Sequence, residues 1–162
     1  MSSAASQPDA EAFREACALF ATGVAIATVR AADGTPHGLT VSSFTSVSME
    51  PPLILVCIDY DCPFLSHFRS GTHFAVNILS DAQRDLSVVF SEKPGGRFEG
   101  VDWYSKGTDA PLLRGALATL ECRVVNIIEV GDHAVFLGEV IAADAMGGKP
   151  LLYFNRDYRT LR

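Results

Sequence analysis

A run of hydroxyl side chains in residues 38–47 is the feature of the sequence best suited to holding a polar ligand. In a single strand, alternate side chains share a face, and one face would then carry Thr40, Ser42, Phe44 and Ser46. Each buried hydroxyl needs a hydrogen-bond partner. One interpretation is that hydroxyls and backbone N–H groups here meet the carbonyls and ring nitrogens of a flat heterocycle. A solvent-exposed edge strand rich in Ser and Thr is the equally open alternative.

A second candidate is His133, which follows Gly131-Asp132 between two apolar segments. A histidine beside a turn aspartate can donate a hydrogen bond or move a proton near neutral pH. The alternative is a surface turn with an incidental histidine, and the local pattern alone favours it. His37, His67 and His73 have weaker claims, because they flank a hairpin end or a short helix.

Two groups of cations could hold a phosphorylated ligand. In residues 91–98, Lys93 and Arg97 share a loop with two glycines. Glycine permits close backbone approach and the cations supply charge, although a mobile surface loop is an equally open reading. Near the C-terminus, aromatic faces and guanidinium groups that could stack on or clamp a nucleotide come from Tyr153, Arg156, Tyr158 and Arg159.

The elements that must position these residues are many short strands with helical covers. Strands are predicted at residues 24–29, 38–47, 53–58, 74–79, 116–128 and 134–142, with a last one near Tyr153. Helices are predicted at residues 10–21, 61–70 and 82–90, and turns at 32–35 and 131–132. This order favours a mainly β fold, a β-barrel with covering helices. No Gly-x-Gly-x-x-Gly opens a helix after the first strand, so a Rossmann site is not supported.

The same patterns predict which side chains are buried. Residues 53–58 form a nearly continuous apolar run and are expected to be buried on both faces. Leu86, Val89 and Phe90 are expected to face inward from their helix. The first helix, capped by Asp9, has one apolar face, made up of Phe13, Ala16, Cys17 and Phe20.

Composition narrows the class of protein. The chain has 162 residues, 48% of them apolar and 20% charged, which suits one folded domain over residues 10–162 after a flexible tail at 1–9. That tail lacks the basic and apolar regions of a secretory signal, and no apolar run is long enough to span a bilayer. The net charge of −6 argues against a nucleic-acid binder and requires local donors for any phosphorylated ligand.

The four cysteines do not have the spacing of a zinc site, and no metal is expected. Cys17, Cys57 and Cys122 lie in apolar segments and are expected to be buried, reduced thiols of a cytoplasmic protein, while Cys62 in a loop could face a ligand.

Taken together, six segments resemble the short-chain flavin reductase family, the reductase components of two-component flavin-dependent monooxygenases. The resemblance runs from about Phe13 to Leu161. In chain order the segments are Phe20-Ala-Thr-Gly-Val24, residues 38–47, Glu50-Pro-Pro-Leu53, Phe74-Ala-Val-Asn-Ile-Leu79 with Gln83, Gly131-Asp-His133 and Gly138-Glu-Val140. Each segment is weak by itself, and their order and spacing are fairly specific.

The resemblance implies an FMN-binding split β-barrel of Greek-key type that forms a homodimer, with flavin in a groove near the dimer interface. It implies an NAD(P)H:flavin oxidoreductase that reduces FMN or FAD by hydride transfer. The reduced flavin would diffuse to a partner monooxygenase.

The same resemblance implies roles for particular residues. Thr40, Val41, Ser42 and Ser43 would meet the isoalloxazine ring, and Cys57, Ile58 and Asp59 would border it. Ser66, Lys93 and Arg97 would lie toward the ribityl phosphate, His133 would act near the nicotinamide, and Arg156 or Tyr158 would close the pocket. The chain departs from the family at Asp61-Cys62-Pro63, where a carboxylate would repel a phosphate, so Ser66 and Lys93 are expected to carry more of that role.

Two other functions stay open. One is a split-barrel oxidase that keeps FMN tightly bound, similar to the pyridoxamine-phosphate oxidases, which would call for a denser basic phosphate site than Lys93 and Arg97 provide. The other is a non-catalytic flavin-binding module.

Overall fold

The computed structural model describes residues 9–92 and 97–161, and it is mainly β, as the sequence predicts. Three helices and a short 3₁₀ turn accompany the strands: α1 (Ala10–Ala18), α2 (Leu65–Ser70), η1 (Asp81–Gln83) and α3 (Arg84–Ser91). The strands are β1 (Thr22–Gly23), β2 (Ala25–Arg30), β3 (Pro36–Val41), β4 (Thr45–Met49), β5 (Pro52–Asp59), β6 (His73–Ile78), β7 (Trp103–Tyr104), β8 (Leu112–Leu113), β9 (Ala118–Val130), β10 (His133–Ala145), β11 (Leu151–Phe154) and β12 (Asp157–Thr160).

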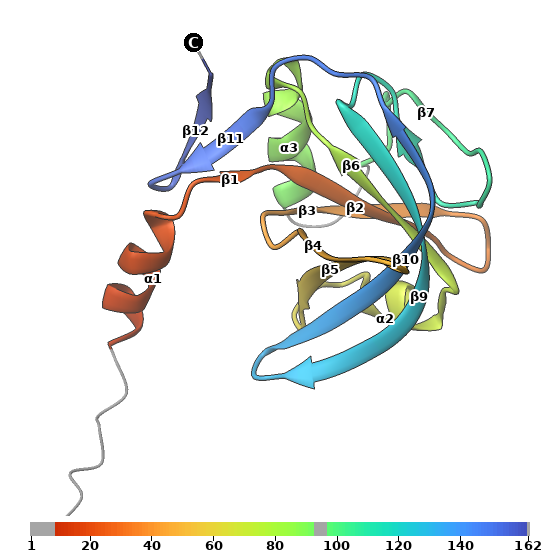
Figure 1. Ribbon diagram of the computed structural model, residues 1–162, viewed down its shortest axis with the longest axis horizontal. Helices are drawn as coiled ribbons and strands as arrows, with labels where there is room; N and C mark the ends of the chain where they lie inside the picture. Colours follow the sequence, from red (N-terminus) through yellow and green to blue (C-terminus); the bar gives the residue numbers. More distant parts are fainter. Residues whose placement is uncertain (1–8, 93–96, 162) are drawn as a thin grey trace, which may run out of the picture.

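The main sheet has seven antiparallel strands in the order β3-β2-β6-β9-β10-β5-β4. Its two edge strands, β3 and β4, are consecutive in the chain, so the short segment between them joins the two edges of the sheet. The sheet therefore curls round on itself, with the long β9–β10 hairpin forming one wall (Figure 1). This is the arrangement expected of a split barrel.

The interior of the curled sheet is filled by apolar side chains. Phe68 from α2 packs against Phe136 of β10, and Phe74 belongs to the same cluster. In β5, Ile54, Val56 and Ile58 are buried, while the residues between them are only partly buried. The prediction that this strand is buried on both faces is therefore wrong, because one face looks outward from the sheet.

A second apolar cluster lies outside the barrel, beneath α3. Phe90 is fully buried there against Leu79, Leu113 and other apolar residues. Ser80 and Gln83 form a capping box at the start of the η1–α3 segment. Val89 is 43% exposed, so its predicted inward orientation is wrong, and the buried residues of α3 are Ser87 and Phe90.

Several element boundaries differ from the sequence prediction. The hydroxyl-rich run at 38–47 is not one strand, because Ser42–Phe44 bend between β3 and β4. The first helix ends at Ala18, and Gly23 lies in β1. The sequence does not predict strands β1, β7, β8 and β12, since each has at most four residues.

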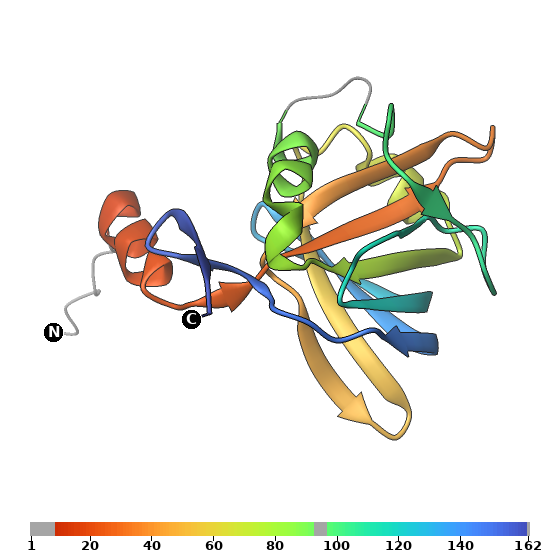
Figure 2. The ribbon, with the colours of Figure 1, turned by 90° about the horizontal axis from the view of Figure 1, so that it is seen from above.

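Helix α1 stands apart from the barrel, beside β11 and β12 (Figures 1 and 2). None of its residues is buried. Phe13, within the helix, is 61% exposed, and Phe20, just after its end, is 77% exposed. Cys17 is also exposed, so its predicted burial is wrong. The apolar face of α1 has no core to pack on within residues 9–92 and 97–161. Within these residues, no helix is both long and apolar enough to cross a membrane.

Candidate functional site

The bend between β3 and β4 is held by a side chain in place of a backbone ladder. The Ser43 hydroxyl donates to the Cys57 carbonyl oxygen at 3.1 Å and accepts from the Cys57 N–H at 2.9 Å. Thr45 pairs with Leu55 in the β4–β5 ladder, so Ser43 lies opposite Cys57 by continuation of that register. The Ser43 hydroxyl proton is thus used inside the protein and is not free for a ligand.

Neighbouring residues of the predicted flavin wall are also engaged within the protein. The Thr40 hydroxyl donates to the Ser87 carbonyl oxygen of α3 at 2.7 Å. Val41 and Ile58 are buried in the barrel core, so a ligand outside the barrel could meet only their backbones. The side chain left exposed at the bend is that of Ser42.

Two grooves meet at Ser42. The larger has a volume of about 920 Å³ and lies between α1 and the bend, where Phe13, Phe20 and Phe44 contribute apolar surface. The smaller, of about 450 Å³, lies between β3, α3 and the β11–β12 hairpin. Both grooves are lined by Val24, Ser42, Tyr153 and Arg156. The hydroxyl-rich segment therefore borders concave surface, as one of its two interpretations requires.

The β11–β12 turn fixes the outer wall of both grooves. Asn155 and Arg156 have φ of 51° and 61°, the left-handed conformation of a two-residue hairpin turn. The Asn155 N–H donates to the Ala18 carbonyl oxygen at the end of α1, at 2.8 Å. Arg156 also donates to Glu11 at 2.6 Å. Arg156 therefore lines both grooves and additionally ties α1 to the hairpin.

Tyr158 anchors the smaller groove to α3. Its hydroxyl lies 2.8 Å from the Ser87 hydroxyl, and the Arg84 guanidinium lies over its ring, 5.4 Å from the centroid. Arg84 and Arg156 line this groove and bring two positive charges to it, alongside the carboxylate of Asp157, in a chain of net charge −6. Such local cations are what a phosphorylated ligand requires here.

His133 stands at the first position of β10, outside both grooves. It pairs with Asp59 of β5, and two residues along the ladder Val135 pairs with Cys57. Since alternate residues share a face, Cys57, Asp59 and His133 lie on the outward face of the barrel wall. Asp132 accepts a hydrogen bond from His133 Nδ1 at 2.6 Å, which holds the pKa of the Asp132 carboxyl below its usual value. The structure therefore places His133 two ladder positions from the strand residue that Ser43 holds.

Of the predicted phosphate residues, neither Arg97 nor Ser66 lines either groove. Arg97 donates from Nη1 to the carbonyl oxygens of Gly38 at 2.9 Å and Phe90 at 2.8 Å, so this guanidinium braces β3 against α3. Burial lowers the pKa of Arg97. Ser66 is exposed on α2, and Lys93 lies outside the described residues.

Cys62, the cysteine expected to face a ligand, is half-buried against the core cluster, and burial raises the pKa of its thiol. Cys57 is half-buried, and Cys122 is fully buried as predicted, where burial raises its pKa to about 12. No cluster of three or more His, Cys, Asp or Glu side chains that could hold a metal occurs in the part of the chain that the structure describes.

Sequence reasoning missed the contribution of α1 and Arg84. Phe13, Arg14 and Cys17 line the larger groove. Their spacing on one helix face was visible in the sequence, but it is equally typical of a face packed on the core. Nothing in the sequence around Arg84 distinguishes it from a solvated helix residue.

Comparisons with known proteins agree with this architecture. Residues 17–162 match a family model described as "Flavin reductase like domain". A "Probable flavin reductase" of Rhizobium meliloti is 40% identical over 154 residues, which are 95% of this chain and 50% of that protein. The reductase component of the flavin-dependent trigonelline monooxygenase of Acinetobacter baylyi is 36% identical over 147 residues, 91% of this chain and 47% of that one.

Among solved structures, the NADH:FAD oxidoreductase SgcE6 of Streptomyces globisporus C-1027, in complex with NAD and FAD fragments, superimposes with a TM-score of 0.90. Its sequence is 35% identical, and the match covers 95% of this chain and 93% of that one. The chain thus spans nearly all of this structural relative, but only about half the length of the two curated relatives above.

Proposed function

The chain belongs to the flavin reductase-like domain family, and on that premise we propose that it is an NAD(P)H:flavin oxidoreductase acting on FMN or FAD. The observation that carries the proposal is the pair of grooves that meet at Ser42, beside the bend between the two sheet edges. A bound flavin would supply the redox chemistry by accepting a hydride from a reduced nicotinamide nucleotide.

The residues at the grooves fit such a ligand. Volumes of about 920 and 450 Å³ lie in or near the range of roughly 300–1,000 Å³ typical of small-molecule sites. The larger groove offers the aromatic rings of Phe13, Phe20 and Tyr153 to a flat heterocycle. The smaller one offers Arg84 and Arg156 to a phosphate.

We assign the binding roles accordingly. Ser42 and the backbone of the bend border the ring, while Thr40 and Ser43 hold that backbone in place through Ser87 and Cys57. The resemblance instead implies that the side chains of Thr40, Ser42 and Ser43 all meet the flavin ring. Such a rigid backbone surface preorganises polar groups without adding buried charge.

His133 is the residue we assign to the nicotinamide side. It shares the outward face of the barrel wall with Asp59 and Cys57, and its imidazole is hydrogen-bonded to Asp132. Within this arrangement His133 can orient a bound nucleotide or donate a hydrogen bond to it.

The reaction product, a reduced flavin, would pass to a partner monooxygenase. The trigonelline monooxygenase reductase component supports this assignment by similarity. We further propose a homodimer in the cytoplasm. The exposed apolar face of α1, with Phe13 at 61% exposure, supports the dimer because a second copy would remove it from water.

The direct test is oxidation of NADH and of NADPH, followed by absorbance, with and without added FMN or FAD. Flavin-dependent turnover with at least one combination is expected. A protein that turns over with substoichiometric flavin and retains that flavin through gel filtration would instead be an oxidase with tightly bound FMN. Flavin binding without turnover would indicate a binding module.

A further inference from the structure

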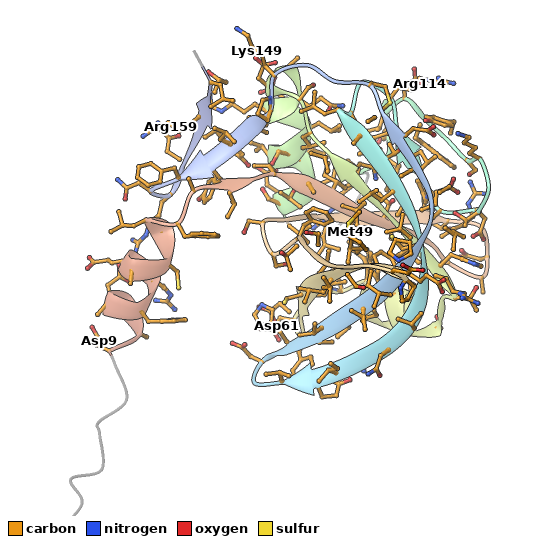
Figure 3. All side chains as sticks on the ribbon, in the orientation of Figure 1. Asp9, Met49, Asp61, Arg114, Lys149 and Arg159 are labelled. Carbon is orange, nitrogen blue, oxygen red and sulfur yellow. The ribbon has the colours of Figure 1, made fainter. Side chains whose placement is uncertain are left out.

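The β9–β10 turn that carries His133 is fastened to the end of β5 by three side chains that no part of the proposed chemistry uses. They are Tyr60, just after β5, Arg69 on α2 and Glu129 near the end of β9. Each comes from a different element. The labelled Asp61, next to Tyr60, lies beside the β9–β10 turn (Figure 3).

Tyr60 holds the turn at two points. Its backbone N–H donates to the Asp132 carbonyl oxygen at 3.0 Å, and its hydroxyl donates to Glu129 Oε2 at 2.6 Å. One acceptor, Asp132, belongs to the two-residue loop Gly131-Asp132, and the other, Glu129, lies on β9 two positions before that loop. Tyr60 therefore contacts both the loop and the strand that enters it.

Arg69 completes the fastening from α2. Its two terminal nitrogens donate to the two carboxylate oxygens of Glu129, one of them at 2.9 Å, in a bidentate pair. The same guanidinium lies 5.9 Å from the centroid of the Tyr60 ring. Bidentate geometry fixes direction as well as distance, so the carboxylate holds one orientation between its two partners.

The charges agree with the geometry. Hydrogen bonds from Arg69 and Tyr60 lower the pKa of Glu129 to about 2. The carboxylate is thus ionised throughout the neutral range. Ion pairs between exposed groups contribute little to global stability, so fastening the turn to β5 is a more specific consequence of this trio than stabilising the fold.

We propose that Tyr60, Arg69 and Glu129 are positioning residues for His133, which fix the β9–β10 turn on β5 and so set the orientation of the imidazole. The inference rests on the proposed function of His133. His133 pairs directly with Asp59, the residue before Tyr60, so a displacement of this junction moves the imidazole relative to the barrel wall. Asp59, Asp61, Asp132, Glu129 and Arg69 are charged groups at this junction.

The test compares Glu129→Ala, Glu129→Gln and Tyr60→Phe with the wild type in anaerobic stopped-flow reduction of flavin by NADH. Misplacement of a group by about 1 Å can cost on the order of 100-fold in rate. We expect Glu129→Ala to slow flavin reduction about tenfold, with the Kd for flavin within about twofold. Glu129→Gln keeps an acceptor for Tyr60 and should recover part of the rate.

The matched control is Arg123→Ala. Arg123 and Glu139 form an ion pair between β9 and β10, at ladder positions away from the turn. Its loss should leave the reduction rate unchanged. If Arg123→Ala and Glu129→Ala slow the reaction equally, or if neither does, the positioning role is refuted.

A second readout does not depend on turnover. ¹⁵N spectra of histidine-labelled protein report the imidazole of His133, assigned by its absence in His133→Ala, and backbone relaxation reports the Gly131 and Asp132 amides. In Glu129→Ala these signals should shift and the amides gain mobility, while Arg123→Ala leaves them in place. A wild type that reduces no flavin would refute the proposed function alone, and unchanged turn signals in Glu129→Ala would refute the positioning role alone.

Discussion

The hydroxyl of Ser43 forms both of the hydrogen bonds with Cys57 that the backbone of an adjacent strand would otherwise form. It does so where β3 has left one edge of the sheet and β4 has not yet joined the other. One side chain thereby links the two edges across the bend. The same link leaves the backbone of Ser42 and its neighbours facing the grooves.

Replacing Ser43 by Ala should destabilise the fold. The Cys57 N–H and carbonyl would lose their partner in a partly buried position, at a cost of about 1–3 kcal/mol. Urea denaturation followed by circular dichroism measures the change, and Ser43→Thr, which keeps the hydroxyl, should lose less. Ser42→Ala is the matched control, since that side chain is exposed. Equal midpoints for Ser43→Ala and Ser42→Ala would contradict the structural role.

Replacing His133 by Ala should slow hydride transfer more than it weakens flavin binding. The residue lies on the outward wall beside Asp59 and outside both grooves at Ser42, so the flavin loses few contacts. A positioned acid, base or hydrogen-bond donor contributes about 100-fold or more to rate. Stopped-flow reduction gives the rate, and fluorescence quenching gives the flavin Kd. A variant that loses binding while keeping its transfer rate would show the assignment to be wrong.

Several parts of the fold were predictable because their signals are local. The turns at 32–35 and 131–132 follow from Asp-Gly and Gly-Asp between apolar runs, and both are present. The strand at 74–79 shifts by only one residue, to His73–Ile78. Alternation and turn chemistry act over a few residues, so one sequence suffices to show them.

The site was less predictable because its geometry depends on long-range pairing. No local signal shows that residues 38–47 divide between two edges of a sheet, or that the Ser43 hydroxyl forms hydrogen bonds with the backbone of Cys57. Arg97 has the composition of a phosphate ligand, yet the carbonyl oxygens of Gly38 and Phe90 take up one of its terminal nitrogens. The spacing of apolar residues predicts the apolar face of α1. Its position at a groove depends on β11 and β12, which are far away in the sequence.

Acidification should weaken the fold through His37. Its ring stacks between Phe64 and His67, at centroid distances of 4.7 and 4.4 Å. Burial, and then the neighbouring His67, hold the pKa of His37 below its ordinary value of 6.5, while Asp33 acts in the opposite direction. The unfolded chain therefore binds a proton near pH 6.5 that the folded chain does not, and stability falls as the pH drops below that value.

His37→Phe should remove this part of the pH dependence while keeping the stack. Urea midpoints at pH 7.5 and 5.5 measure it for both proteins, and the variant should show the smaller drop. His73→Phe, at a histidine outside the stack, serves as the control. An identical drop in His37→Phe and wild type would mean that other groups account for the acid sensitivity.

Gly138 is expected to tolerate no side chain. It lies at a register irregularity between β9 and β10, and a Cβ built there would stand 2.6 Å from Phe74 Cζ and 3.0 Å from Cys122 Cβ. Phe74 is fully packed in the barrel core, so the ring cannot turn away without displacing its neighbours. Overpacking of this kind costs about 1–3 kcal/mol.

Gly138→Ala should therefore lower the urea midpoint. Gly138→Ala combined with Phe74→Leu should lose less stability than the sum of the two single changes, because the smaller side chain leaves room for the methyl group. Gly23→Ala, where no atom lies within 4 Å of the built Cβ, is the control expected to change little. Strict additivity in the double variant would show that the contact with Phe74 is not the cause.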